Sequence, residues 1–336
     1  TTTTPTGSAR VREQLGDQVL HVYCPYDLPL ALTGFIRRVR PRALLMVETE
    51  IWPNLLHLCR RHGVYTLLAN ARLSEKSARR YARLGRFARQ TFLHIDRVAA
   101  QAEPDAARFR ELGVPVERVT VTGSIKFDMR IAASLDEQVE VLRRDWGGRP
   151  VWVAGSTHEG EDELVLSAHH KVLSRFPNAL LILVPRHPER FERVGSLCKR
   201  EHLDMARRSR SGEYRNETQV YLGDTMGELP ILLGSADVAF IGGSLVMTGG
   251  HNMLEASAQG VAVCFGPHVF NFAAISQLLI EQGAARQVGS EAELADQVIA
   301  WFEDASARAE VGENGRRVVE QNRGALQRLI DLIPLR

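Results

Sequence analysis

Lysine, cysteine and long apolar runs are scarce in this sequence of 336 residues. Only four lysines, at positions 76, 126, 171 and 199, stand among 42 basic residues, so almost all of the positive charge is arginine. The four cysteines are scattered without a Cys-x-x-Cys pair, which fits reduced thiols in a cytosolic compartment better than a disulfide scaffold or a zinc site. No stretch is long and apolar enough to span a bilayer.

Several motifs of nucleotide and metal chemistry are also missing. The sequence has no His-Glu-x-x-His or His-x-His pattern, and no Asp-x-Asp pair in a loop that follows a strand. We therefore expect no metal site and no cofactor, and nucleotide chemistry that is independent of metal. A phosphate-binding Gly-x-x-x-x-Gly-Lys-Ser/Thr loop is absent, which argues against a P-loop NTPase. No recognition helix, RNA-binding pattern or zinc finger supports a nucleic-acid partner.

The bulk composition is that of an ordinary soluble protein with room for two hydrophobic cores. Hydrophobic residues make up 44% and charged residues 24%, and the formal net charge is +2. Arginines crowd the first half, as at Arg37, Arg38, Arg60, Arg61 and Arg79. Composition alone favours solvated helix faces, and the alternative is a patch that faces anionic lipid head groups.

Short apolar runs alternate with helical patterns throughout, which predicts an α/β fold with parallel sheets. We expect two Rossmann-like domains facing each other across a cleft, at 1–147 and 148–310, followed by a C-terminal helix at 311–336. The expected strands are 20–23, 43–47, 64–69, 97–100 and 119–122, then 151–154, 179–184, 219–222, 238–241 and 261–264. The expected helices include 74–92, 136–145, 162–175, 188–200, 226–233, 252–259 and 273–282.

A glycine-rich stretch, residues 242–255, is the most informative motif. It follows the apolar run 236–241 and leads into a helical pattern. Glycines let the backbone approach a ligand closely, and unpaired amides at a helix start suit an anion. Glu255 lies one turn into that helix, where its carboxylate can accept hydrogen bonds from a ribose diol. The stretch therefore predicts a nucleotide site in the second half of the chain.

Three more loops of the second half follow expected strands, where ligands of open parallel sheets bind. Ser156 and Thr157 can donate to a phosphate, although they equally suit a plain capped loop. Arg186, after Pro185, can clamp a phosphate at a strand end, with a surface pair to Glu189 as the alternative. Backbone groups of Met226, Gly227 and Glu228 can read a base edge, with simple helix capping as the alternative.

Two charged residues stand at strand ends in the first half. Glu48 follows the expected strand 43–47, and we assign it a chemical role. Lys126 lies in the loop after 119–122, where an ammonium can neutralise developing negative charge. The alternative for Lys126 is a surface pair with Asp128 of little energetic weight.

Taken together, these motifs resemble one family along essentially the whole chain and in the same order. The family is the 3-deoxy-D-manno-octulosonic acid (Kdo) transferases of lipid A biosynthesis. The motifs that carry the resemblance are TTTTPTG at 1–7, ETEIWPN at 48–54, NARLS at 70–74, GSIKFD at 123–128, GSTH at 155–158, PRHPER at 185–190, GDTMGE at 223–228, GGSLVMTGGHNMLE at 242–255 and FGPH at 265–268.

The resemblance implies an inverting, metal-independent glycosyltransferase of the GT-B type. It would move Kdo from the donor CMP-Kdo to lipid IVA, in lipopolysaccharide biosynthesis at the cytoplasmic face of the bacterial inner membrane. The motifs that match the family's CMP contacts are Pro185 and Arg186, 226–228, and Asn252, Met253, Leu254 and Glu255. Glu48 and Lys126 would stabilise the transition state.

Two departures from the family qualify these expectations. The family's general base, a glutamate in a Ser-Val-Gly-Glu motif, and its membrane anchor would both lie before Thr1. We therefore expect an N-terminal domain that lacks its first part, and donor binding without turnover in this chain. In addition, Met253 and Ala256 stand where the family often has proline.

Two alternatives remain at this point. One is another GT-B nucleotide-sugar enzyme or a UDP-sugar epimerase, which base preference would separate from a Kdo transferase. The other is a nucleotide-sugar binding module without turnover.

Overall fold

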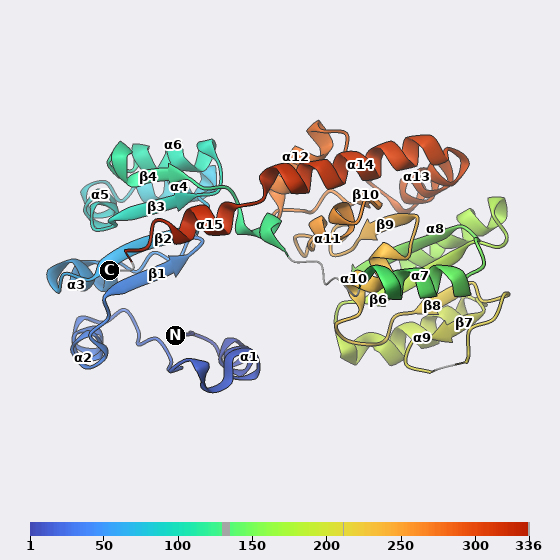
Figure 1. Ribbon diagram of the computed structural model, residues 1–336, viewed down its shortest axis with the longest axis horizontal. Coiled ribbons are helices and arrows are strands. Elements are labelled where there is room, and N and C mark those ends of the chain that lie inside the picture. The colour runs from blue at the N-terminus through green and yellow to red at the C-terminus, as the bar shows by residue number, and fades with distance from the viewer. Residues whose placement is uncertain (130–134, 211, 335–336) are drawn as a thin grey trace. The chain divides into compact units, whose positions relative to one another are not determined.

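The chain forms two compact units (Figure 1). A computed structural model describes residues 1–129, 135–210 and 212–334. The first unit comprises Thr1–Asp128 together with the chain from Arg323 onward, and the second comprises Met129–Asn322. We expected the first domain to reach residue 147, but the helix α7 (Leu135–Asp145) packs on α10 (Leu229–Gly234) of the second unit. The expected C-terminal helix is the later part of α14 (Ala305–Asn322) followed by α15 (Ala325–Ile330).

The first unit is built on a four-stranded sheet in which every neighbouring pair is parallel and the order is β1-β2-β3-β4. Its strands are β1 (Ala43–Val47), β2 (Tyr65–Ala71), β3 (Arg97–Ala100) and β4 (Val119–Val121). Its helices before the boundary are α1 (Pro5–Leu15), α2 (Pro29–Val39), α3 (Pro53–Arg61), α4 (Glu75–Ala82), α5 (Arg86–Leu93) and α6 (Glu103–Glu111), with short 3₁₀ turns at η1 (Gly16–Gln18), η2 (Val116–Arg118) and η3 (Ile125–Asp128). Four of the five strands expected here are thus confirmed.

The beginning of the chain differs from the expectation. The run 20–23 is not a strand, and only Tyr23 makes an isolated bridge, to Thr2. The threonine run leads into a helix, because the Thr4 side chain accepts from the Gly7 amide and Pro5 suits the first helical turn. Apolar side chains in this segment face solvent, including Leu20. A strand needs a partner edge, and no strand of the sheet pairs with these described residues.

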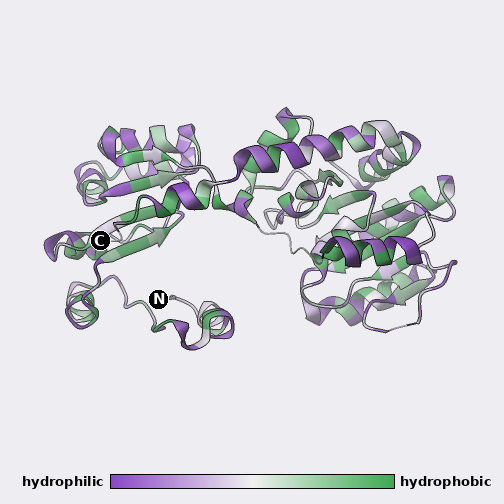
Figure 2. Cartoon of the chain, viewed as in Figure 1, coloured by the Kyte–Doolittle hydropathy of each residue, from purple (hydrophilic) through white to green (hydrophobic). Residues whose placement is uncertain are grey.

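The second unit is a seven-stranded parallel sheet with the order β11-β10-β9-β5-β6-β8-β7. The strands are β5 (Val151–Thr157), β6 (Leu180–Pro185), β7 (Met205–Arg207), β8 (Val220–Leu222), β9 (Val238–Ile241), β10 (Ala262–Phe265) and β11 (Ala285–Gln287). All five strands expected in this half are present, and the short edge strands β7 and β11 are additions. Both sheets are mostly apolar (Figure 2). The central strands of the second sheet are buried, as in parallel sheets covered on both faces, whereas Leu45 and Val47 of β1 are exposed.

Alternate residues of the central strands pack against helices on the two faces of this sheet. On one face, Trp152, Leu181 and Phe240 share a core with residues of the helices α8, α9 and α13. A second group of helices contacts one another and the sheet, in the pairs α10 with α11 and α11 with α14. The remaining bounds are α8 (Asp162–Arg175), η4 (Pro188–Arg190), α9 (Phe191–Arg200), α11 (Leu254–Ala258), α12 (Ala273–Glu281) and α13 (Glu291–Glu303).

The last helix returns to the first unit and is held there by three kinds of contact. Asp128 accepts from the amides of Gly324 at 2.5 Å and Leu326 at 2.6 Å, which caps α15. Arg328 donates to the carbonyl of Thr122 at 2.8 Å, and Leu329 packs against β2 and β3. The loop that carries Lys126 is therefore fixed by residues from the far end of the chain.

Candidate functional site

The second unit has a topological switch point between β5 and β9. From β5 the chain builds β6, β7 and β8 on one side, and it then builds β9, β10 and β11 on the other. Ligands of such sheets bind outside the carboxyl ends of the strands at this point. The two loops that leave these ends are 156–161 after β5 and 242–253 after β9, and both were singled out by their sequences.

These two loops touch backbone to backbone at Gly242. A β-carbon at this position would lie 2.7 Å from the carbonyl oxygen of Ser156 and 2.8 Å from the α-carbon of Thr157. No side chain fits in that space, so glycine is needed here for the approach of the loops to each other. The glycine-rich stretch therefore serves the packing of the site as well as access of a ligand.

A buried carboxylate joins the same two loops. Glu161 is fully buried, and it accepts hydrogen bonds from the amides of Gly243 at 2.6 Å, Ser244 at 3.0 Å and Leu245 at 2.9 Å. It also accepts from the amide of His158 in its own loop, at 3.1 Å. Both carboxylate oxygens thus accept hydrogen bonds from the backbone.

This arrangement corrects the expected use of the glycine-rich loop. We predicted that its amides and the helix start behind them are open to an anion, but Gly243, Ser244 and Leu245 already donate to Glu161. The first amide of α11, that of Leu254, donates to the side chain of Asn252 at 3.2 Å. These four amides are therefore not open to an anion, and side chains around the loops are candidates for its recognition.

The side chains available for that role converge from three strand ends. Arg186 follows β6, and its backbone amide donates to Thr157 at 3.0 Å. Its charge acts on His158, His251 and Glu255, and it lowers the pKa of each. For Glu255 burial is the larger effect and raises the pKa, and Asn252 donates to this carboxylate at 3.1 Å.

His158 in the loop after β5 and His251 in the loop after β9, here called the imidazole pair, link the two loops. Their Nε2 atoms are 2.7 Å apart, and the ring planes are within 8° of parallel. Burial is the main cause that lowers the pKa of both rings, to about 4 for His251. A third ring, that of His187, meets His158 edge-on at a centroid distance of 5.4 Å.

The other predicted residues of this unit lie at the same edge of the sheet but differ in what they can offer. Thr157 donates to Asp162 at 2.6 Å, and Asp162 also pairs with Arg190, so the Thr157 hydroxyl is engaged. The side chains of Met253 and Leu254 are fully buried, which leaves only their backbone for a ligand. Ser156 is buried with a φ of 59°. Pro185 is buried where β6 pairs with the end of β5.

In the loop after β8, the carbonyl of Glu228 accepts from the amides of Ile231 and Leu232, and its carboxylate is engaged as well. Arg208 binds Glu228 with a distance of 2.7 Å between Nη2 and Oε1, and Thr225 donates to the same group. Met226 is exposed, and Gly227 has a φ of 85° that suits glycine. The prediction that backbone groups at 226–228 read a base is compatible with this geometry and stays a prediction.

In the first unit, Glu48 and Lys126 meet. Although β1 and β4 are the two edges of the sheet, the Lys126 Nζ lies 3.4 Å from the Glu48 Oε1. Glu48 has a φ of 60°, which is uncommon outside glycine and is frequent at functional sites. Asn70 supports the pair, because its side chain accepts from the Ile125 amide at 3.1 Å. Asp128, the alternative partner named for Lys126, accepts from the amides of Gly324 and Leu326 and so caps α15.

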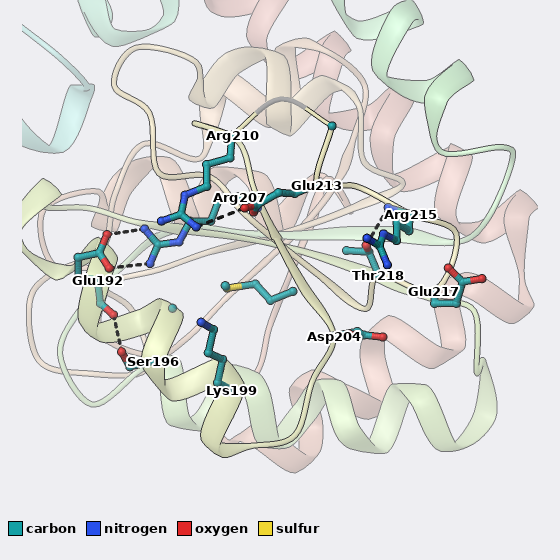
Figure 3. A pocket seen from close by; sticks show the side chains of 13 residues that line it. Glu192, Ser196, Lys199, Asp204, Arg207, Arg210, Glu213, Arg215, Glu217 and Thr218 are labelled. Atoms are coloured by element: carbon teal, nitrogen blue, oxygen red, sulfur yellow. Dashed lines mark hydrogen bonds and ion pairs between the residues drawn. The ribbon is translucent and has the colours of Figure 1, made fainter.

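A hollow at the β7 edge of the second unit is not the candidate donor site (Figure 3). Its volume is about 590 Å³. Two of its arginines are already paired, Arg207 with Glu192 through two hydrogen bonds and Arg210 with Glu213. None of the motifs after β5, β6 or β9 lines it.

Comparison with known proteins decides the family. A family model described as 3-deoxy-D-manno-octulosonic-acid transferase (kdotransferase) matches residues 1–129. The chain is 43% identical over 335 residues to the 3-deoxy-D-manno-octulosonic acid transferase of Haemophilus influenzae, covering 99% of this chain and 78% of that protein. The chain belongs to the Kdo transferase family. The protein of the same name from Bordetella pertussis is 37% identical, with coverage of 99% and 79%.

Solved structures agree with this family and with the GT-B fold. The C-terminal CMP-Kdo binding domain of WaaA from Acinetobacter baumannii is 32% identical, covers 56% of this chain and all of its own, and superposes with a TM-score of 0.54. A glycosyltransferase from Rickettsia africae, 14% identical, has a TM-score of 0.60 over 96% of this chain and 85% of its own, which shows the fold alone. The family and the α/β fold class expected from the motifs are confirmed.

The sequence analysis did not predict the role of three residues that organise the site, although Asn70 and Asp128 lie inside quoted motifs. Glu161, Asn70 and Asp128 act on backbone amides of distant loops, at sequence separations that no local pattern encodes. His158 and His251 lay inside quoted motifs, but their contact could not be read from spacing. For Glu161, one signal was available, because a carboxylate directly before a helix and after a buried strand often binds backbone amides.

We predict that Glu161→Gln lowers the free energy of unfolding of the second unit by about 2–4 kcal/mol, because the amide group places a donor against backbone donors. Denaturant unfolding followed by the fluorescence of the buried Trp152 and Trp301 measures the loss. Glu159→Gln is the matched control, since Glu159 is an exposed residue of the same loop and should change stability by at most about 0.5 kcal/mol. Equal stability of both variants would contradict the role of Glu161.

Proposed function

We propose that this chain is the part of a glycosyltransferase that moves Kdo from CMP-Kdo to lipid IVA, with inversion and without a metal ion. Membership of the Kdo transferase family carries the proposal. The relative from Acinetobacter baumannii is described as a CMP-Kdo binding domain, and it covers 56% of this chain. Kdo transfer in lipopolysaccharide synthesis is the activity that the family name implies.

The second unit would bind the CMP moiety of the donor. Arg186 offers a fork of donors to the phosphate, at the end of β6 and beside the imidazole pair. Glu255 offers a carboxylate to the ribose hydroxyls, and the exposed backbone of 226–228 can meet the edge of cytosine. Because Glu161 engages three amides of the glycine-rich loop, we assign the positive charge for the phosphate to side chains.

Glu48 and Lys126 of the first unit would act on the reacting sugar. In the transfer, the bond between the anomeric carbon and the phosphate oxygen breaks and its electron pair stays on the phosphate. The acceptor hydroxyl forms the new bond and loses its proton to a base. Positive charge develops on the sugar and negative charge on the leaving group, so a carboxylate and an ammonium 3.4 Å apart can stabilise both.

The membrane surface is the proposed place of action, because the acceptor is an anionic amphiphile. Among residues 1–129, 135–210 and 212–334, no helix has both the length and the apolar character to cross a bilayer. The first unit exposes Tyr26 and Leu30, 83% and 91% accessible, next to Arg37 and Arg38 of α2. Apolar and cationic side chains on one segment are suited to peripheral contact with anionic lipid.

Arg186→Ala and Glu255→Ala should each weaken the binding of CMP by about tenfold or more, which corresponds to about 1.4 kcal/mol. Calorimetric titration of each variant with CMP measures this. Arg193→Ala is the control for arginine removal, since Arg193 is exposed on α9 and pairs with Glu159. Wild-type affinity in both site variants would contradict the assignment of the donor site.

In a version of the chain extended at its N-terminus by the family's Ser-Val-Gly-Glu segment, Glu48→Ala should lower the rate of Kdo transfer to lipid IVA by about 10²–10³-fold, with the affinity for CMP unchanged, because Glu48 acts in the transition state and not on the nucleotide. Mass spectrometry of the lipid product follows the transfer. The neighbouring Glu50→Ala, in which only an exposed contact to Trp52 is lost, should transfer at the normal rate. A loss of CMP affinity as large as the loss of rate would argue against this role.

The chain should bind vesicles that contain anionic lipid, and the binding should weaken as salt is added, because charges at a membrane surface are screened. Co-sedimentation with vesicles measures it, and the double variant Arg37→Gln/Arg38→Gln should bind less. Arg316→Gln, on α14 of the second unit, is the matched control. Binding that depends neither on salt nor on the two arginines would contradict the proposed surface.

A further inference from the structure

The imidazole pair is the part of the donor site whose chemistry the motifs leave unassigned. The Nε2 atoms of His158 and His251 are 2.7 Å apart, while the ring centroids are 4.9 Å apart with the planes nearly parallel. If the rings were stacked face to face, their nitrogens would be separated by at least the spacing between two ring planes in contact, which is larger than 2.7 Å. The rings therefore lie side by side, with one Nε2–H donating to the lone pair of the other Nε2.

A bond of this kind accepts one additional proton without rearrangement. In the neutral pair one ring carries its proton on Nε2 and the other on Nδ1. If the pair binds one more proton, an imidazolium donates to a neutral imidazole, which is a stronger, charge-assisted bond. A second additional proton would place two Nε2–H groups against each other. The pair can therefore hold one positive charge and no more.

The charged and titratable groups around the pair oppose that charge in the free protein. Burial lowers the pKa of both rings, and the positive charges of Arg186 and Arg190 and the ring of His187 act in the same direction. Glu161 is the opposing group and raises the pKa of His158. With these contributions the free pair is neutral near pH 7, although a single anion would suffice to reverse the balance.

We propose that the imidazole pair takes up one proton when the phosphate of the nucleotide binds, and so serves with Arg186 as the site's cation for that phosphate. The pair lies at the carboxyl ends of β5 and β9, which is the topological switch point of the sheet. The amides of Gly243 and Ser244 nearby are already engaged by Glu161. The inference rests on the proposed binding of CMP.

The proton has a use in the reaction. While the donor is intact, its phosphate is a diester with one negative charge. When the bond to the sugar breaks, the electron pair remains on the phosphate oxygen and a second negative charge develops there. A proton already held on the pair stabilises that charge and is not itself transferred. His158 and His251 are thereby positioning residues for the leaving group and also a source of its counter-charge.

Calorimetric titration with CMP in several non-phosphate buffers of different ionisation enthalpy measures the proton directly. At pH 7 we expect uptake of half to one proton per CMP bound, with affinity falling as pH rises toward the pKa of the complex. CMP bound as a dianion releases protons from its phosphate, so uptake with that form comes from the protein. CMP bound as a monoanion would itself take up a proton, and that uptake would persist in variants that lack the imidazole pair. Cytidine, which lacks the phosphate, should show no uptake.

Single substitutions His158→Gln and His251→Gln should each abolish the uptake, because either change removes the bond between the Nε2 atoms. His170→Gln, an exposed histidine paired with Glu201 on the surface of the same unit, should leave it intact. Far-ultraviolet circular dichroism and thermal unfolding confirm that each variant is folded. Signals of ¹⁵N-labelled histidines during the CMP titration provide a second readout, in which two Nε2 resonances should shift together.

Heats that are equal in all buffers, or uptake that persists in both pair variants, would overturn the inference while leaving the proposed function intact. Failure of the folded wild-type chain to bind CMP would instead contradict the proposed function, and the inference with it.

Discussion

The buried carboxylate of Glu161 is the interaction on which the donor site depends. It binds four backbone amides from the loops after β5 and β9. Those loops meet at the topological switch point of the sheet. Without it, Gly243, Ser244 and Leu245 would need other acceptors at a position that water reaches poorly. The close approach at Gly242 and the contact between His158 and His251 both require the loops to be held in this way.

This constraint changes how the site recognises an anion. Glycine-rich loops in many nucleotide-binding proteins hold phosphate with their amides, whereas the amides here hold a carboxylate of the protein itself. Charge for the ligand then comes from Arg186 and from histidines that are neutral in the free protein. Selectivity for a singly or doubly charged phosphate can be tuned by such groups, because their protonation responds to the ligand. This chain thus shares its fold with other nucleotide-sugar enzymes. At its switch point, however, three loop amides bind a carboxylate of the protein and not a phosphate of the ligand.

Local patterns in the sequence predicted most of the fold and part of the site. The runs 97–100 and 238–241 are strands with the expected bounds, and 162–175 is a helix, because buried apolar runs and capped amphipathic patterns are local signals. The run 20–23 is equally apolar but lacks a partner strand, so its conformation depends on tertiary context. The local pattern around Glu161 indicates a carboxylate that binds backbone amides, but it does not indicate which amides, since those of Gly243 to Leu245 lie more than 80 residues away in sequence. Proximity of Glu48 to Lys126, from opposite edges of a sheet, was inferred only through the family.

The central claim is that the second unit is built for a cytidine nucleotide. Calorimetric titration of the folded chain with CMP, UMP, UDP and AMP, each in the presence of a chelator, tests it most directly. The account predicts that CMP binds in preference to the other three and that the chelator has no effect. Preference for UDP, or binding of CMP that requires an added divalent metal, would contradict it.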